Sequence, residues 1–165
     1  MWTYNGKLIR EGRSWTDNKD VQHPPNWNIW SEEEKLLHGM IWVEPQEKPD
    51  ERFYWFSQNA DGTYKSTPKN LDDLKTYWIA NTKKIQGNIL SETDWVYIRK
   101  LDKGREVPFN IQIYRNNVRR AAETIETNIK NCLTLDEFKT LFVSPVDEDG
   151  NIIGKEPINN WPDNI

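Results

Sequence analysis

Residues 71–129 read LDDLKTYWIANTKKIQGNILSETDWVYIRKLDKGREVPFNIQIYRNNVRRAAETIETNI. Two amphipathic patterns flank a central block, ILSETDWVYIRK, which begins with turn and cap residues. In both patterns apolar residues recur at spacings of three and four, which predicts helices with one buried stripe. The first stripe contains Leu71, Leu74, Trp78, Ile85 and Ile89, and the second contains Ile111, Tyr114, Val118, Ala121, Ile125 and Ile129.

Start and stop residues divide this stretch into three helices. Asn70 is a good N-cap, Gly104 is a good helix terminator, and Pro108 suits the first turn of a helix. We therefore predict helices over residues 71–90, 93–103 and 108–130. Downstream, Thr134 and Glu137 form a capping-box pattern that predicts a short helix over residues 135–142. A hairpin at residues 147–150 and an extended tail carrying Trp161 follow it.

The first 70 residues have a different pattern, with short runs that alternate or are rich in aromatic side chains. Asn5-Gly6 separates residues 2–4 from 7–9 and suits a type I′ hairpin turn. Further strands are expected at residues 14–16, 21–23, 40–43, 52–57 and 63–66. Ser31 and Glu34 form another capping-box pattern, which predicts a short helix closed by Gly39.

These patterns predict an α+β protein with three parts. Residues 1–70 would form a small, aromatic-rich β-hairpin domain, and residues 71–133 a three-helix antiparallel unit. Residues 134–165 would form a short helix, a hairpin and the C-terminal tail. Short connections between the helices favour packing within one chain, although a bundle formed across chains in a homo-oligomer stays open.

Composition restricts the class of function. The 165 residues include nine tryptophans but only 36% hydrophobic side chains, which indicates a folded protein with a polar surface. The net charge of −4 gives no reason to expect nucleic-acid binding. No apolar run is long enough for a membrane span, and the single cysteine fits a reducing compartment. We expect a soluble, non-secreted protein without nucleic-acid or membrane partners.

Residues suited to catalysis are scarce. His23 and His38 flank the segment 27–30 without a third ligand nearby, so they predict structural roles rather than a metal site. Cys132 lacks the basic surroundings of a nucleophile and reads as a buried thiol at a helix end. No glycine-rich phosphate motif is present. We expect no enzymatic activity, no catalytic residues, no metal and no cofactor.

The aromatic side chains of the first 70 residues allow two interpretations. They could fill the core of a small domain, or some could contact a partner protein or a glycan. Phe53-Tyr54-Trp55-Phe56 is a run of four aromatics, and a strand sends alternate side chains to opposite faces. The candidate partner-binding residues are Trp27, Trp30, Trp42, Phe53 and Trp55.

The central block carries a resemblance to a known family. The segments LSETDW, IR, VP, YR and VR occur in the order of a pattern, LLxxTDWxxxR…G…xP…YRxxLR, found in small tail-fibre assembly proteins of tailed bacteriophages. The segment GRSWTDNKDVQHPPNWNIWS resembles small marine-phage proteins with G-x-SWTD-x-x-G-x-QHP-x-NW-x-x-WS. Lys19-Asp20 stands where those proteins have a glycine turn, so the loop here is expected to differ. The motif residues are Thr93, Asp94, Trp95, Arg99, Tyr114, Arg115 and Arg119.

The same motif has a purely structural interpretation. Thr93 and Asp94 would satisfy free N–H groups at the helix start, while Trp95 and Ile98 would face the neighbouring helices. The three arginines are long enough to reach the carboxylates of Asp94 or Glu92 and brace the junction.

The resemblance implies a non-enzymatic chaperone or fibre-tip accessory that binds a tail fibre and aids its trimerisation. Such a protein would act in the host cytoplasm during assembly and could be retained in the virion tail. Two alternatives stay open: a permanent structural component of the virion, such as a tail, adaptor or capsid-decorating protein, and a glycan-binding module that uses exposed tryptophans.

Overall fold

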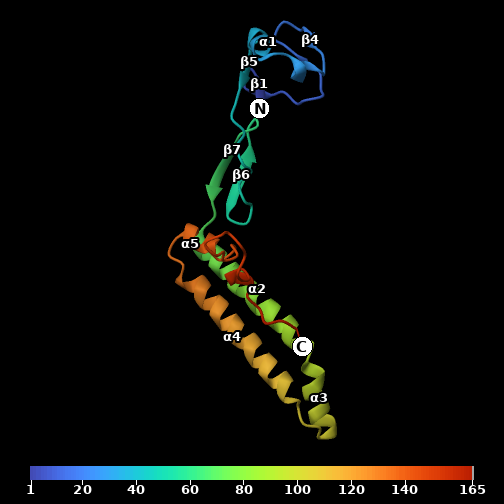
Figure 1. Cartoon of the computed structure of the whole chain (residues 1–165), viewed down its shortest axis with the longest axis vertical. Helices are drawn as coiled ribbons and strands as arrows, with labels where there is room; N and C mark the ends of the chain where they lie inside the picture. The colour runs from blue at the N-terminus through green and yellow to red at the C-terminus, as the bar shows by residue number, and fades with distance from the viewer. Residues whose placement is uncertain (165) are drawn as a thin grey trace. The chain divides into compact units, whose positions relative to one another are not determined.

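The computed structural model describes residues 1–164 and is a mixed α+β structure, 44% helical and 15% strand. The chain divides into two compact units, Met1–Pro68 and the remainder from Lys69 onward. Short antiparallel strands dominate the first unit, and helices dominate the second (Figure 1). The predicted change of pattern near residue 70 is therefore also a boundary between compact units.

The first unit is built around a three-stranded antiparallel sheet with the order β2-β1-β5. The strands are β1 (Trp2–Tyr4), β2 (Lys7–Leu8) and β5 (Met40–Trp42). Asn5 and Gly6 have φ angles of 47° and 70°, as the predicted type I′ turn between β1 and β2 requires. β5 pairs with the other edge of β1, with Thr3 opposite Ile41.

A loop layer closes over this sheet and forms a small core. It contains the hairpin β3 (Trp15–Thr16) and β4 (Gln22–His23), the 3-10 helix η1 (Trp27–Ile29) and α1 (Glu32–Leu37). The predicted capping box is present at α1, where Ser31 and Glu34 satisfy each other's backbone N–H groups. The fully buried centre consists of Ile9, Trp27 and Met40.

The hairpin of β6 (Tyr54–Gln58) and β7 (Tyr64–Pro68) completes the first unit. Its turn is anchored because the backbone N–H of Leu8 donates to the carbonyl of Ala60 at 2.7 Å. Gly62 has a φ of 89°, and a Cβ there would meet the Met1 sulfur at 2.7 Å. Glycine is therefore required by both the backbone angle and the close packing of this turn.

The second unit is organised by two long antiparallel helices, α2 (Leu71–Ser91) and α4 (Phe109–Asn131) (Figure 1). The helix α3 (Asp94–Lys103) joins them and ends at Gly104, whose φ is 67°. Asn70 caps α2 through bonds from the N–H groups of Asp72 and Asp73. The apolar stripe of α4 is buried within the chain, at Tyr114, Val118, Ala122, Ile125 and Ile129.

The C-terminal part of the second unit packs on α4. The predicted capping box of Thr134 opens α5 (Leu135–Thr140), which is two residues shorter than expected. The predicted hairpin is reduced to a bridge between Val146 and Ile152. The 3-10 helix η2 (Pro157–Asn159) contacts α4, and Trp161 is buried. The tail is thus part of the packing around α4.

Candidate interaction surfaces

Arg115 holds the junction between α2, α3 and α4. Its Nη1 donates to the carbonyl of Leu90 at 2.6 Å and to Oγ1 of Thr93 at 2.7 Å, and lies 2.8 Å from Oδ1 of Asp94. Its guanidinium also lies 4.8 Å from the ring centroid of Tyr97. Because the side chain of Arg115 is 10% exposed, these charge-assisted bonds act with little competition from water.

Three details of the predicted brace are wrong. Within residues 1–164, Arg99 forms no ion pair with Asp94 or Glu92. The hydroxyl of Thr93 does not cap α3; it donates to the carbonyl of Leu90 at 3.1 Å and accepts from Arg115. Among the residues that the structure describes, Arg119 bonds only to the side chain of Asn116, with 3.2 Å from Nη1 to Oδ1. The cause is helix geometry, because Arg119 lies one turn beyond Arg115 along α4. Of the two arginines, Arg115 is the one that contacts Leu90, Thr93 and Asp94 at the junction.

Tyr114 and Arg99 take other positions around the same junction. Tyr114 is buried, and its hydroxyl donates to Oδ1 of Asn164 at 3.1 Å. Burial raises the pKa of the Tyr114 hydroxyl, and the charge of Glu92 adds to the effect. The guanidinium of Arg99 lies 4.9 Å from the ring centroid of Trp95, which is a cation–π geometry.

The prediction that Trp95 and Ile98 face the neighbouring helices is also wrong. Trp95 is 57% exposed, Ile98 is 64% exposed and Leu101 is 88% exposed. The buried apolar residue of α3 is instead Val96. At about 100° per residue, four exposed apolar side chains fall on one side of the helix, which also carries the exposed Asp94 and Asp102. We call these four side chains the α3 surface; they are Tyr97, Leu101, Ile98 and Trp95.

A hollow of about 320 Å³ borders the α3 surface. It is lined by Trp95 and Val96 of α3, by Ile111 and Tyr114 of α4, by Asn164 of the tail, and by Glu92 and Thr93, which lie just before α3. The α3 surface therefore combines exposed aromatic and aliphatic side chains with an adjacent depression. This combination suits a protein partner that inserts an apolar side chain.

The five aromatic residues predicted to bind a partner occupy different environments. Trp27 is 1% exposed and its Nε1 donates to the carbonyl of Arg13 at 3.2 Å. Phe53 is also buried. Trp30 is half-buried and packs on the ring of His38, with 4.7 Å between ring centroids. These three side chains belong to the interior of the first unit or its margin.

Trp42 and Trp55 lie on the surface of the first unit. Trp42 is 51% exposed, packs edge-on against Trp2 at 5.4 Å, and donates from Nε1 to Glu44 at 3.2 Å. Trp55 is 68% exposed on β6. A hollow of about 270 Å³ lies beside Trp42, lined also by Trp2, Glu32 and Leu36. We call the two exposed apolar side chains that line this hollow the unit 1 surface; they are Leu36 and Trp42.

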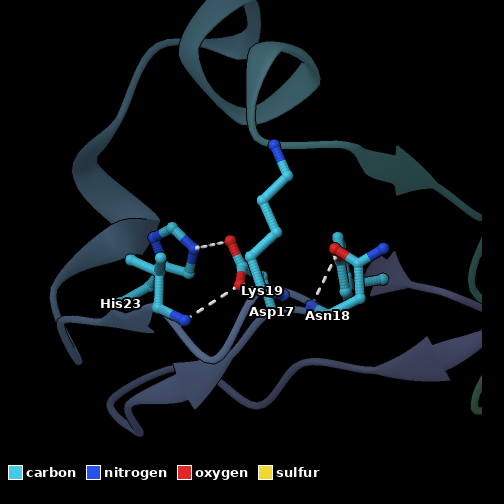
Figure 2. Close-up of polar contacts among 6 residues, drawn as sticks. Asp17, Asn18, Lys19 and His23 are labelled. Carbon is cyan, nitrogen blue, oxygen red and sulfur yellow. Dashed lines mark hydrogen bonds and ion pairs between the residues drawn. The ribbon is translucent and has the colours of Figure 1, made fainter.

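The histidines belong to a ring cluster. His23 is buried and stacks on Trp15 with 4.2 Å between ring centroids. Its Nε2 lies 3.3 Å from Oδ2 of Asp17, and Figure 2 draws this contact as a dashed line. A bond from the backbone N–H of Val21 is the main reason that the pKa of Asp17 lies below its usual value. His38 packs against His23 with 4.9 Å between ring centroids. Among residues 1–164, no group of three His, Cys, Asp or Glu side chains is arranged to hold a metal ion.

Cys132 follows the last residue of α4 and is buried, as predicted. Its Sγ donates to the carbonyl of Asn128 at 3.2 Å, and burial raises the pKa of the thiol. A raised pKa lowers the fraction of nucleophilic thiolate at neutral pH.

Comparison of the chain with family models, curated proteins and solved structures finds no match. Within the described residues, none of the helices has the length and apolar character needed to cross a bilayer.

Proposed function

We propose that this protein is a non-enzymatic tail-fibre assembly factor that binds the fibre through the α3 surface and aids trimerisation. The observation that carries the proposal is the exposure of the α3 surface. Leu101 is 88% exposed and Ile98 is 64% exposed, while the smaller Val96 is the buried apolar residue of the same helix. A cluster of large exposed apolar side chains commonly marks a protein-binding site.

The motif shared with tail-fibre assembly proteins supports this assignment in a specific way. Thr93, Asp94 and Arg115 are motif residues, and they form the bonds that fix the start of α3. Trp95 is also a motif residue, and it is displayed on the α3 surface. Thr93, Asp94 and Arg115 would therefore position α3, and Trp95 on α3 would contact the fibre. Both sets of motif residues then serve the same proposed contact.

The chemistry of the proposed partner follows from the surface. Aliphatic and aromatic side chains on one arc match the apolar side chains that a fibre chain exposes before its trimer closes. Covering them during assembly in the host cytoplasm would suppress aggregation until three chains associate. A side chain of the fibre that inserts into the hollow beside Trp95 would make this apolar contact specific.

Co-expression with the fibre protein from the same genome tests the proposal. With the wild-type chain, the fibre is expected to form soluble trimers that resist dissociation. The variant Leu101→Asp is expected to lose this effect because it places a charge in the centre of the α3 surface. Leu133→Asp is the matched control, since Leu133 is 83% exposed and lies outside α3. Equal yields of fibre trimer with and without the wild-type chain would contradict the proposal.

The unit 1 surface favours a second candidate function, a permanent component of the virion. A protein with a separate apolar patch in each of two compact units has the surfaces needed to join two partners. Mass spectrometry of purified virions separates the two functions. Many copies per particle would support the permanent component, whereas absence from the particle would support the assembly factor.

A further inference from the structure

A basic hollow lies in the first unit and shares no lining residue with the hollow beside Trp42. Its volume is about 310 Å³, at the small end of the range of roughly 300–1,000 Å³ for ligand pockets. Residues of the β1–β2 hairpin and of the segment leading into β3 line it. The hollow is therefore large enough for one ring-sized group and its substituents.

Three cationic side chains line this hollow: Lys7, Arg10 and Arg13. The lining contains no aspartate or glutamate. Within residues 1–164, none of these three cations forms an ion pair with a carboxylate. Three unpaired cations around one depression repel one another, and a bound oxyanion would offset this repulsion while forming charge-assisted hydrogen bonds.

The remaining lining is aromatic, hydroxylated and, at Leu8 and Ile9, aliphatic. Tyr4 and Trp15 contribute rings whose centroids are 4.8 Å apart with an interplanar angle of 44°. Ser14 and Thr16 contribute hydroxyl groups. An inorganic anion would use only the cations, whereas a ring bearing both an acid and hydroxyl groups would use every kind of group in the lining.

The aromatic part of the lining is held in place by its neighbours. The Tyr4 hydroxyl donates to Oδ1 of Asn18 at 2.7 Å and accepts from the backbone N–H of Asn18 at 3.1 Å. Trp15 stacks on His23, which is fixed in turn by the Asp17 carboxylate; Figure 2 shows Asp17, Asn18 and His23 in this loop. Rings fixed before binding reduce the entropy lost when a ligand stacks on them.

We propose that this hollow binds a carboxylated sugar ring of the uronate type. The carboxylate pairs with Arg10 and Arg13, the C–H face of the sugar packs against Trp15, and the sugar hydroxyls bond to Ser14 and Thr16. Guanidinium groups suit this role because they bind carboxylates with two parallel hydrogen bonds. This site shares no residue with the α3 surface, so the proposal does not rest on the proposed fibre contact.

Titration of the full chain with trigalacturonate tests the proposal, using calorimetry and the ¹⁵N-indole NMR signals of the tryptophans. We expect saturable binding and a selective shift of the Trp15 indole signal. The variant Arg10→Gln/Arg13→Gln should weaken binding by at least about 10-fold, since each lost bond involves two charged groups. Both side chains are exposed, and thermal melting checks that the variant remains folded.

The control variant Lys65→Gln/Lys83→Gln makes the same change in net charge at exposed lysines outside the hollow, and should bind as the wild type does. Three results would overturn the proposal. Equal binding of neutral trigalactose would show that the cations are not used, and equal weakening by the control variant would show general charge attraction. Equal or tighter binding of inorganic phosphate or an aspartate-rich peptide would show that the sugar ring is not recognised.

Discussion

The helices α3 and α4 belong to the same compact unit, and both carry apolar residues at helical spacing. On α4 the apolar stripe is covered by α2 and by the C-terminal tail, and Val118 is completely buried. On α3 only Val96 is buried, and the larger apolar arc faces solvent. An apolar stripe therefore predicts that a helix face is buried in a contact. Only the three-dimensional packing shows whether that contact is made within the chain or is left open to a partner.

The largest effect is expected from a charge in the α4 stripe. Val118→Asp places an unpaired carboxylate in a fully buried position, which we expect to cost more than about 4 kcal/mol and to unfold the second unit. Circular dichroism during thermal melting measures this loss. Val118→Ala, at about 2 kcal/mol, is the control for simple truncation. A Val118→Asp protein that stays folded but changes its oligomeric state would show that this stripe is an interface.

Removing Arg115, which holds the junction between α2, α3 and α4, has the next largest expected effect. Arg115→Met keeps the apolar stem but leaves the Leu90 carbonyl and the Thr93 hydroxyl without this donor. Because bonds to charged groups each contribute about 1.5–3 kcal/mol, we expect a loss of about 2–3 kcal/mol. Urea denaturation gives this value. Arg119→Met should change stability by less than about 0.5 kcal/mol, and an equal loss in both variants would contradict the role of Arg115.

The cap of α2 has a smaller expected effect. Asn70→Ala removes the acceptor for the N–H groups of Asp72 and Asp73, which should cost about 1 kcal/mol. Asn88→Ala, at an exposed position inside α2, is the control and should be neutral or slightly stabilising. Urea denaturation of both variants measures the difference. A neutral Asn70→Ala would show that tertiary packing alone sets the start of α2.

The smallest expected effect is a loosening of the C-terminal tail in acid. A bond from Lys155 Nζ to Asp163 Oδ1, at 2.6 Å, is the main cause that lowers the pKa of Asp163 below 3.8. A carboxylate with a lowered folded-state pKa contributes stability above its unfolded pKa and loses it as the pH falls through the folded value.

Hydrogen exchange of the tail amides between pH 5 and pH 2, compared with Asp163→Asn, measures this effect. We expect the wild-type tail to lose protection below about pH 4 and the variant to lack that step. If the tail amides of wild type and Asp163→Asn lose protection over the same pH range, a group other than Asp163 causes that loss.

Local sequence signals predicted the local structure well. The Asn5-Gly6 turn, the capping boxes at Ser31 and Thr134, and the end of α3 at Gly104 are all present. Each depends on a few neighbouring residues, whose backbone preferences and side-chain bonds decide the outcome without distant contacts.

Long-range packing could not be predicted in the same way. The pairing of β1 with β5 joins residues about forty positions apart, and the burial of Trp161 depends on where the tail meets α4. For α3, periodicity located an apolar arc at Trp95 and Ile98 but not its exposure. That exposure follows from the long α2–α4 contact, which covers only the Val96 side of the short connecting helix.

The central claim is that the α3 surface is a binding surface rather than part of the core, and Leu101→Asp tests it most directly. The measurement is the free energy of unfolding in urea together with binding of the fibre protein by calorimetry. The account predicts a change in stability of less than about 0.5 kcal/mol and a loss of fibre binding. A variant that unfolds the second unit, or one that binds the fibre as tightly as wild type, would contradict it.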